Sequence, residues 1–295
     1  MSTGRSRARC FVGVLLLFVG SALARVAGPA KLKSEEVLAR YLDSIGAAEA
    51  RSAVKSRVAR GTCRMAIVQG GNGVVQGPAV FESEGRKIAL KATFNYPEYP
   101  GELLGFDGEK VRTPYVSPGR RSRLGDLVFE FEIVLREGLF GAALSTASPL
   151  FDLSGRKALL DYEGVKKING RDLHQLLYRA RRDAPNMTIR LYFEPDTFRH
   201  VMTIYDVTAG GTLGGNPDDP AQRGSARIQA AAANRLRIEE TFSDFKPSSG
   251  LMLPTSWKLR FSTEPATGPA RIFEWTTVFN QIADNEPFDP ALFNP

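Results

Sequence analysis

The chain has 295 residues, of which 43% are hydrophobic and 24% charged, with 39 basic and 32 acidic side chains. This composition excludes a disordered polyelectrolyte, because it supplies ample apolar surface for a core. The two cysteines exclude a small disulfide-stapled fold. Since there are also only two histidines, we expect no metal site and no cofactor.

Residues 1–24 have the pattern of a secretory signal peptide. Three arginines precede an uncharged apolar run at 11–23, and small residues around Ala24 favour cleavage after that position. The apolar run is short for a bilayer core about 30 Å thick, which disfavours a membrane anchor. Cys10 precedes the run and is not placed for lipidation. We therefore predict an unlipidated periplasmic protein whose mature chain, residues 25–295, is a single domain.

Cleavage would change the charge and the cysteine content of the chain. It removes three arginines from a net charge of +7, so the mature chain is nearly balanced and nucleic acid is not an expected partner. It also leaves Cys63 as the one cysteine, for which a buried strand position is the favoured interpretation over a reactive thiol.

Helical spacing of apolar residues occurs in two parts of the mature chain. Near its start, the pattern predicts a helix over 34–45 with Ser34 as its cap, then a short helix over 47–54. Further on, it predicts two short helices within 124–149, which we call the lid. The apolar lid residues at helical spacing are Leu124, Leu127, Val128, Phe131, Val134 and Leu135.

The rest of the chain is dominated by the two-residue period of antiparallel strands. In 251–262, apolar residues alternate with mostly polar ones, which predicts a half-buried strand. Asp107-Gly108 and Asn169-Gly170 are hairpin turn signals between such runs. About eleven strands are predicted, joined as a meander, with a flexible glycine-rich loop at 209–227. The predicted class is α+β, mostly antiparallel β.

No motif for catalysis is present. His174 and His200 both lie inside strand patterns, where a structural histidine is the favoured interpretation, so we expect no enzymatic activity. The basic clusters at 120–123 and 179–182 are interpreted as solvated loop charge. Contact of the first cluster with an anionic membrane surface is the alternative.

A curved meander needs a cover over its apolar face, and the predicted helices are the available covers. A gap between lid and sheet, lined by apolar and aromatic residues, would suit acyl chains, because binding them removes apolar surface from water. On the sheet side, the candidate lining residues are Trp257, Leu259, Phe273 and Trp275.

Four segments resemble the LolA-like periplasmic proteins: 31–65, with an amphipathic helix and a long first strand, the hairpins of 190–207 and 240–261, and the terminal segment 285–295. The resemblance implies an unclosed half β-barrel with a helical lid over a hydrophobic cavity. It also implies carriage of lipids, lipoprotein acyl chains or another amphiphile, so the implied partner is a lipid or acylated protein. This chain is longer than the carrier it resembles, and no functional residue is carried over.

Two other functions stay open from the sequence. One is a non-catalytic module that docks an envelope protein through its sheet. The other is a hydrolase that uses His174 or His200. In each case we expect a monomer.

Overall fold

The fold is described here from a computed structural model for Met1 and residues 32–181, 187–208, 233–265, 269–287 and 289–295. Apart from Met1, the predicted signal peptide lies outside these ranges, and so does the whole predicted glycine-rich loop at 209–227. Residues Leu32–Pro295 form one compact unit.

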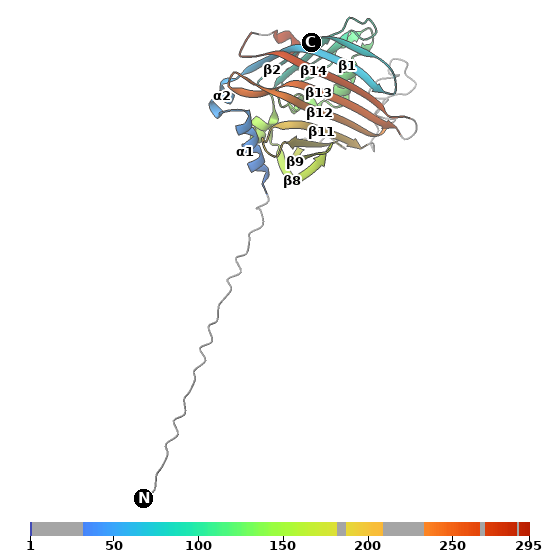
Figure 1. Ribbon diagram of the computed structural model, residues 1–295. Coiled ribbons are helices and arrows are strands. Elements are labelled where there is room, and N and C mark those ends of the chain that lie inside the picture. The colour runs from blue at the N-terminus through green and yellow to red at the C-terminus, as the bar shows by residue number, and fades with distance from the viewer. Residues whose placement is uncertain (2–31, 182–186, 209–232, 266–268, 288) are drawn as a thin grey trace. The chain divides into compact units, whose positions relative to one another are not determined.

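Within the described residues, twelve strands form one antiparallel sheet, in the order β5-β4-β3-β2-β1-β14-β13-β12-β11-β10-β9-β8 (Figure 1). The strands are β1 Ser56–Gln69, β2 Val74–Glu84, β3 Lys87–Thr93, β4 Gly101–Phe106, β5 Val111–Arg112, β8 Leu159–Ile168, β9 Arg171–Arg179, β10 Met187–Phe193, β11 His200–Thr208, β12 Ala233–Ser248, β13 Leu251–Pro265 and β14 Arg271–Asp284. This is one strand more than the sequence pattern predicts, and a separate hairpin is formed by β6 Tyr115–Ser117 and β7 Arg120–Arg121.

Except for the edge strands β5 and β8, consecutive strands of the sheet are neighbours, and the first strand, β1, lies beside the last, β14, in the middle of the sheet. The first strand pairs with the last, from Arg57 opposite Asp284 to Ile67 opposite Phe273. The predicted Asp107-Gly108 and Asn169-Gly170 turns connect β4 to β5 and β8 to β9. In the described part of the chain β5 and β8 each have one neighbour, so the sheet does not close into a barrel.

The predicted N-terminal helix is present as α1, Ser34–Ile45, with α2, Ala48–Ala53, after it. The predicted cap is wrong, because the N-cap residue is Lys33 and Ser34 is already helical. Glu36 replaces the hydroxyl cap: its carboxylate accepts a 2.8 Å hydrogen bond from the Lys33 backbone N–H. α1 buries Val37, Tyr41 and Ile45 in the hydrophobic core.

The lid lies in the connection between the two sheet edges, which runs from β5 to β8. This connection contains α3 Arg123–Glu130, α4 Ile133–Arg136, the 3-10 helix η1 Pro149–Phe151 and α5 Leu153–Arg156. The side chain of Ser122 caps α3 by accepting a 2.9 Å hydrogen bond from the Gly125 N–H. Between α4 and η1 the backbone forms turns that are almost wholly buried. The lid therefore packs into the core as both helix and loop.

The C-terminal segment, residues 289–295, lies on the face of the sheet opposite the lid. It includes the 3-10 helix η2, Pro290–Phe293, which contacts β3 and β4. Phe293 is buried, and the ammonium of Lys87 lies 5.7 Å from its ring centroid. A Cβ added at Gly105 would lie 2.6 Å from the carbonyl oxygen of Leu292, so the strand and the segment are in close contact.

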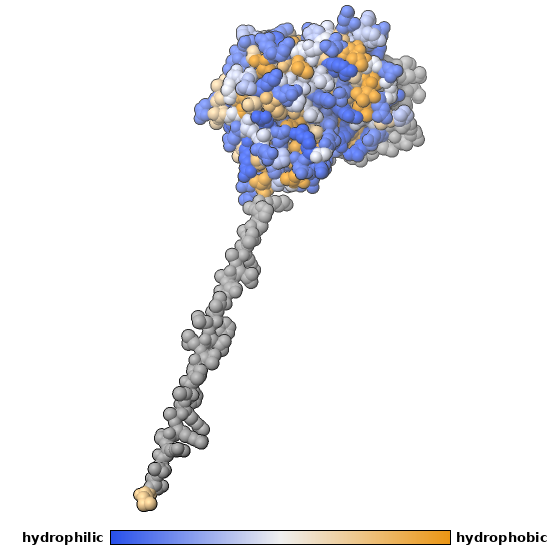
Figure 2. Space-filling view, in the orientation of Figure 1, coloured by the Kyte–Doolittle hydropathy of each residue, from blue (hydrophilic) through white to orange (hydrophobic). Residues whose placement is uncertain are grey.

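The surface seen in Figure 2 is mostly hydrophilic, with hydrophobic residues in separate patches (Figure 2). None of the described helices combines the length and the apolar character needed to cross a bilayer.

Candidate functional site

The ten predicted lining residues are all buried in the hydrophobic core. Each is between 0% and 8% exposed, and all belong to a single hydrophobic cluster that joins the lid to the sheet. They are Leu124, Leu127 and Val128 on α3, Phe131 after it, Val134 and Leu135 on α4, Trp257 and Leu259 on β13, and Phe273 and Trp275 on β14. A ligand would reach these side chains only if the lid moved, so their role in binding stays a prediction.

A buried carboxylate on β12 binds the loop part of the lid. Glu240 accepts hydrogen bonds from the backbone N–H of Gly141 at 2.8 Å, the indole N–H of Trp257 at 2.8 Å and the hydroxyl of Tyr205 at 2.7 Å. Burial raises the pKa of Glu240 to about 7, although these donors oppose the shift. One sheet carboxylate thus holds a lid amide and orients an aromatic side chain beneath it.

A second buried carboxylate does the same at the start of α3. Glu102 on β4 accepts a 3.2 Å hydrogen bond from the Leu124 N–H and a 2.8 Å bond from the indole N–H of Trp275. The hydroxyl of Tyr99 donates a further hydrogen bond to this carboxylate. Burial raises the pKa of Glu102 to about 8. Glu102 therefore attaches the helical part of the lid to the sheet, and Glu240 attaches its loop part.

Sequence reasoning missed both acids, although each lies in an alternating apolar register. Leu236, Ile238, Glu240 and Phe242 alternate along β12 and are all buried, so Glu240 is the acid within an apolar face. An acid in such a register needs a hydrogen-bonding partner inside the protein. Glu102 has the same register on β4, where it alternates with Leu104 and Phe106 and all three are buried.

The loop part of the lid is closely packed against the sheet. The rings of Phe140 and Trp257 meet edge to face, with centroids 4.7 Å apart. A Cβ added at Gly138 would lie 2.0 Å from the carbonyl oxygen of Ala147, and one at Gly141 would lie 3.0 Å from the Phe81 ring. Both glycines also have positive φ, which side chains disfavour. The backbone conformation and the lack of space for a Cβ therefore each require glycine at these positions.

An apolar cleft opens beside this loop. It encloses about 200 Å³ between α1, α2, the lid and β13. Its apolar lining is Ile45, Val54, Ala143, Phe151, Leu251 and Leu253. Leu251 and Leu253 are almost fully buried, whereas Phe151 is 43% exposed. The cleft thus leads from the surface at Phe151 toward the core under the lid.

Basic residues line the same cleft. Arg57 is ion-paired with Asp284 at 2.7 Å and donates a 2.7 Å hydrogen bond to the carbonyl of Leu144 in the lid. Arg51 and Lys55 bind only backbone carbonyls through their cationic groups, and neither forms an ion pair within the described ranges. These two positive charges beside the cleft therefore have no carboxylate partner among the described residues.

The histidines have structural environments. His200 is 1% exposed, its Nε2 lies 3.0 Å from the Met202 carbonyl oxygen, and burial lowers its pKa to about 4. His174 stacks on Phe198 with ring centroids 4.9 Å apart, and desolvation lowers its pKa. Cys63 is buried, as predicted, and burial raises its pKa to about 11. The described residues contain no cluster of three His, Cys, Asp or Glu side chains placed to hold a metal ion.

The first basic cluster is partly engaged with aromatic rings. The Arg121 guanidinium lies 4.0 Å from the Phe129 ring centroid, and that of Arg123 lies 4.8 Å from the centroid of Phe273. Arg120 is exposed. In the second cluster, Arg179 pairs with Asp161 at 2.6 Å. Membrane contact by these residues stays a prediction.

No family model matches this chain, and no curated protein matches it. Solved structures with a similar fold include a LolA superfamily protein from Nitrosomonas europaea, at 13% identity and a TM-score of 0.43, covering 88% of this chain and 97% of that one. Another is a putative outer membrane lipoprotein-sorting protein domain from Vibrio parahaemolyticus, at 10% identity and a TM-score of 0.44, covering 87% of this chain and 97% of that one. A LolA superfamily protein and a lipoprotein-sorting protein domain are thus among the structural neighbours of the chain at low identity, as the sequence resemblance predicted.

Proposed function

We propose that this protein is an exported periplasmic carrier of an amphiphile that has an apolar chain and an anionic head. The observation that carries the proposal is the cleft of about 200 Å³, because its apolar lining adjoins the positive charges of Arg51 and Lys55. The head would meet these charges while the chain entered past Phe151 toward Leu253. No catalytic group is required.

The cleft is smaller than the roughly 300–1,000 Å³ typical of ligand sites, so an acyl chain requires more space. The lid supplies that space if it moves, because its inner side and the sheet beneath it are both apolar. Each CH₂ transferred from water into this interior contributes about 0.8 kcal/mol. Long chains therefore offset the loss of lid contacts better than short ones.

The test is binding of cis-parinaric acid, a fluorescent fatty acid, to purified residues 25–295. We expect saturable fluorescence, and lipid in organic extracts of the protein by mass spectrometry. The variant R51Q/K55Q should bind the acid about ten-fold more weakly, the loss of one to two charge-assisted contacts. Lys166 is exposed on β8 away from the cleft, so Lys166→Gln is the matched control and should bind normally.

The methyl ester of the same probe separates head from chain, since it has no negative charge. R51Q/K55Q should leave its binding unchanged. If wild-type protein neither binds the acid saturably nor contains lipid, the carrier proposal is wrong. A crosslinked envelope protein recovered from such lipid-free protein would support the docking module instead.

A further inference from the structure

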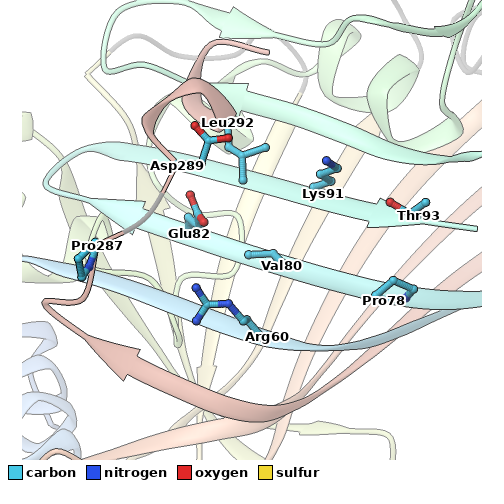
Figure 3. A pocket seen from close by; sticks show the side chains of 9 residues that line it. All are labelled: Arg60, Pro78, Val80, Glu82, Lys91, Thr93, Pro287, Asp289 and Leu292. Carbon is cyan, nitrogen blue, oxygen red and sulfur yellow. The ribbon is translucent and has the colours of Figure 1, made fainter.

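A second cavity lies on the face of the sheet opposite the lid. It is an open groove of about 610 Å³ between the strands β1–β3 and the C-terminal segment (Figure 3). Its lining residues are Arg60, Pro78, Val80, Glu82, Lys91, Thr93, Pro287, Asp289 and Leu292. Its volume falls within the range of small-molecule sites, about 300–1,000 Å³. None of these residues belongs to the lid or its cleft.

Glu82 forms the floor of this groove and is unusual there. The residue is only 3% exposed, and its Oε2 has no hydrogen-bond partner in the described structure. Its cross-strand neighbours on the same face, Val58 and Ala89, are almost fully buried and offer no side-chain donor. A buried carboxyl oxygen without a donor costs about 1–3 kcal/mol. Since this oxygen is closed to solvent, a ligand in the groove recovers that cost only if the Glu82 side chain rotates and presents the oxygen to a donor.

Two cations flank this acid without pairing with it. Arg60 and Lys91 both lie opposite Val80, one on each neighbouring strand. Each is therefore a diagonal neighbour of Glu82, at a typical separation of about 7–8 Å. Neither forms an ion pair within the described ranges, and Figure 3 shows both side chains beside the groove. The groove thus has a hydrogen-bond acceptor, Glu82, in its floor. The positive charges of Arg60 and Lys91 lie beside Val80, two residues before Glu82 on β2.

We propose that this groove binds a small zwitterion, with its N–H donor on Glu82 and its anionic group between Arg60 and Lys91. Apolar atoms of such a ligand would rest on Val80 and Leu292. Asp289, on the C-terminal segment above, adds negative charge on the side of the donor. This chemistry occurs in an aminoethyl phosphate headgroup and in a free dipeptide. The site is independent of the carrier function, because it lies on the other face of the sheet.

Titration of the purified protein with phosphoethanolamine, followed by NMR amide shifts, tests the proposal. We expect saturable shifts for β1–β3 residues lining the groove. Phosphocholine is the matched probe, since it has similar charges but no N–H donor on its nitrogen, and should bind at least about five-fold more weakly. Glycylglycine has a carboxylate in place of the phosphate, so comparing the two probes shows whether the site prefers a dipeptide or a phosphate headgroup. Binding of either donor-bearing probe supports the zwitterion site, and binding of neither overturns it.

The variant Glu82→Gln keeps the shape of the side chain but removes the charge. It should weaken phosphoethanolamine binding about ten-fold while its thermal unfolding stays cooperative. Glu84→Gln is the control, because Glu84 lies on the same strand, pairs with Lys87 and does not line the groove. Should Glu82→Gln bind as the wild type does, Glu82 is not the acceptor and the assignment fails. Binding of cis-parinaric acid by this variant should be unchanged.

Discussion

Glu102 and Glu240 carry the same set of donors in two parts of the sheet. Each accepts a hydrogen bond from an indole, a phenol hydroxyl and a lid backbone amide. Each is also fully buried, so desolvation raises its pKa even though these donors oppose the shift. Protonation of these two residues is therefore linked to the stability of the closed lid.

We expect the protein to lose stability as the pH rises from 6.5 to 9. A carboxyl whose folded pKa is raised stabilises the fold below its unfolded pKa, and this contribution is lost as the pH rises through the folded value. For Glu240 and Glu102 those values are about 7 and 8. The decrease in unfolding free energy, measured by urea unfolding, should be on the order of 2 kcal/mol.

The variant E102Q/E240Q should lose most of this pH dependence, and Glu82, whose pKa burial raises to about 7, should retain the remainder. His200 does not contribute in this window, because its pKa is lowered to about 4. An unchanged slope in the double variant would contradict the assignment of the linked protons to these two acids.

Gly141 combines a positive φ with close packing. We expect Gly141→Ala to destabilise the protein by about 2–4 kcal/mol, since the new methyl adds crowding against Phe81 to a backbone cost of about 1–2 kcal/mol. Gly85 is the control, because its φ is +56° and a Cβ there meets nothing within 4 Å. Gly85→Ala should show the backbone cost alone in denaturant unfolding. Equal losses in both variants would mean that the loop yields to the methyl.

At the scale of elements, the sequence predicted the first half of the lid better than the second. Helical spacing correctly indicated α3 and α4, since their apolar residues face one side. Between them and η1, the backbone is held by distant groups: Glu240 binds the Gly141 amide, Ser83 binds the Thr146 amide at 3.0 Å, and Arg57 binds the Leu144 carbonyl. Local periodicity contains no information on such partners.

Phe131 tests how firmly the lid is part of the core. Phe131 is the C-cap residue of α3 and is 8% exposed, whereas Phe129, within α3, is 41% exposed. We expect Phe131→Asp to cost several kcal/mol, because an unpaired charge would be buried. Phe129→Asp should cost less than about 1 kcal/mol, since its carboxylate reaches solvent beside Arg121. Urea unfolding measures both, and a mild effect of Phe131→Asp would show that the lid opens at little cost.

At the scale of the whole molecule, turn signals predicted which consecutive strands pair. They could not predict the pairing of β1 with β14, because no turn joins these strands. The cleft was also beyond sequence reasoning, since its lining comes from α1, the lid and β13, which are far apart in the chain. The groove on the face opposite the lid could not be predicted either, because its lining combines β1–β3 with the C-terminal segment.

The sheet order predicts a gradient of amide protection. In native-state hydrogen exchange, β1, β13 and β14 should exchange slowest, because strands on both sides satisfy and cover their backbone groups. The edge strands β5 and β8 should exchange fastest. Equal protection of β8 and β14 would indicate that an additional partner covers the β8 edge.

The pairing of the first strand with the last has a consequence for the timing of folding. A chain synthesised from its N-terminus presents β1 early, yet β14, the partner on one side of β1, is made after every other described strand. Until then, β1–β5 and β8–β13 are two half-sheets with open edges, and sequence-distant pairing of this kind is slow. The twelve-stranded sheet of the described residues is therefore incomplete until β14 has been made, and its two halves join only in a late step of folding.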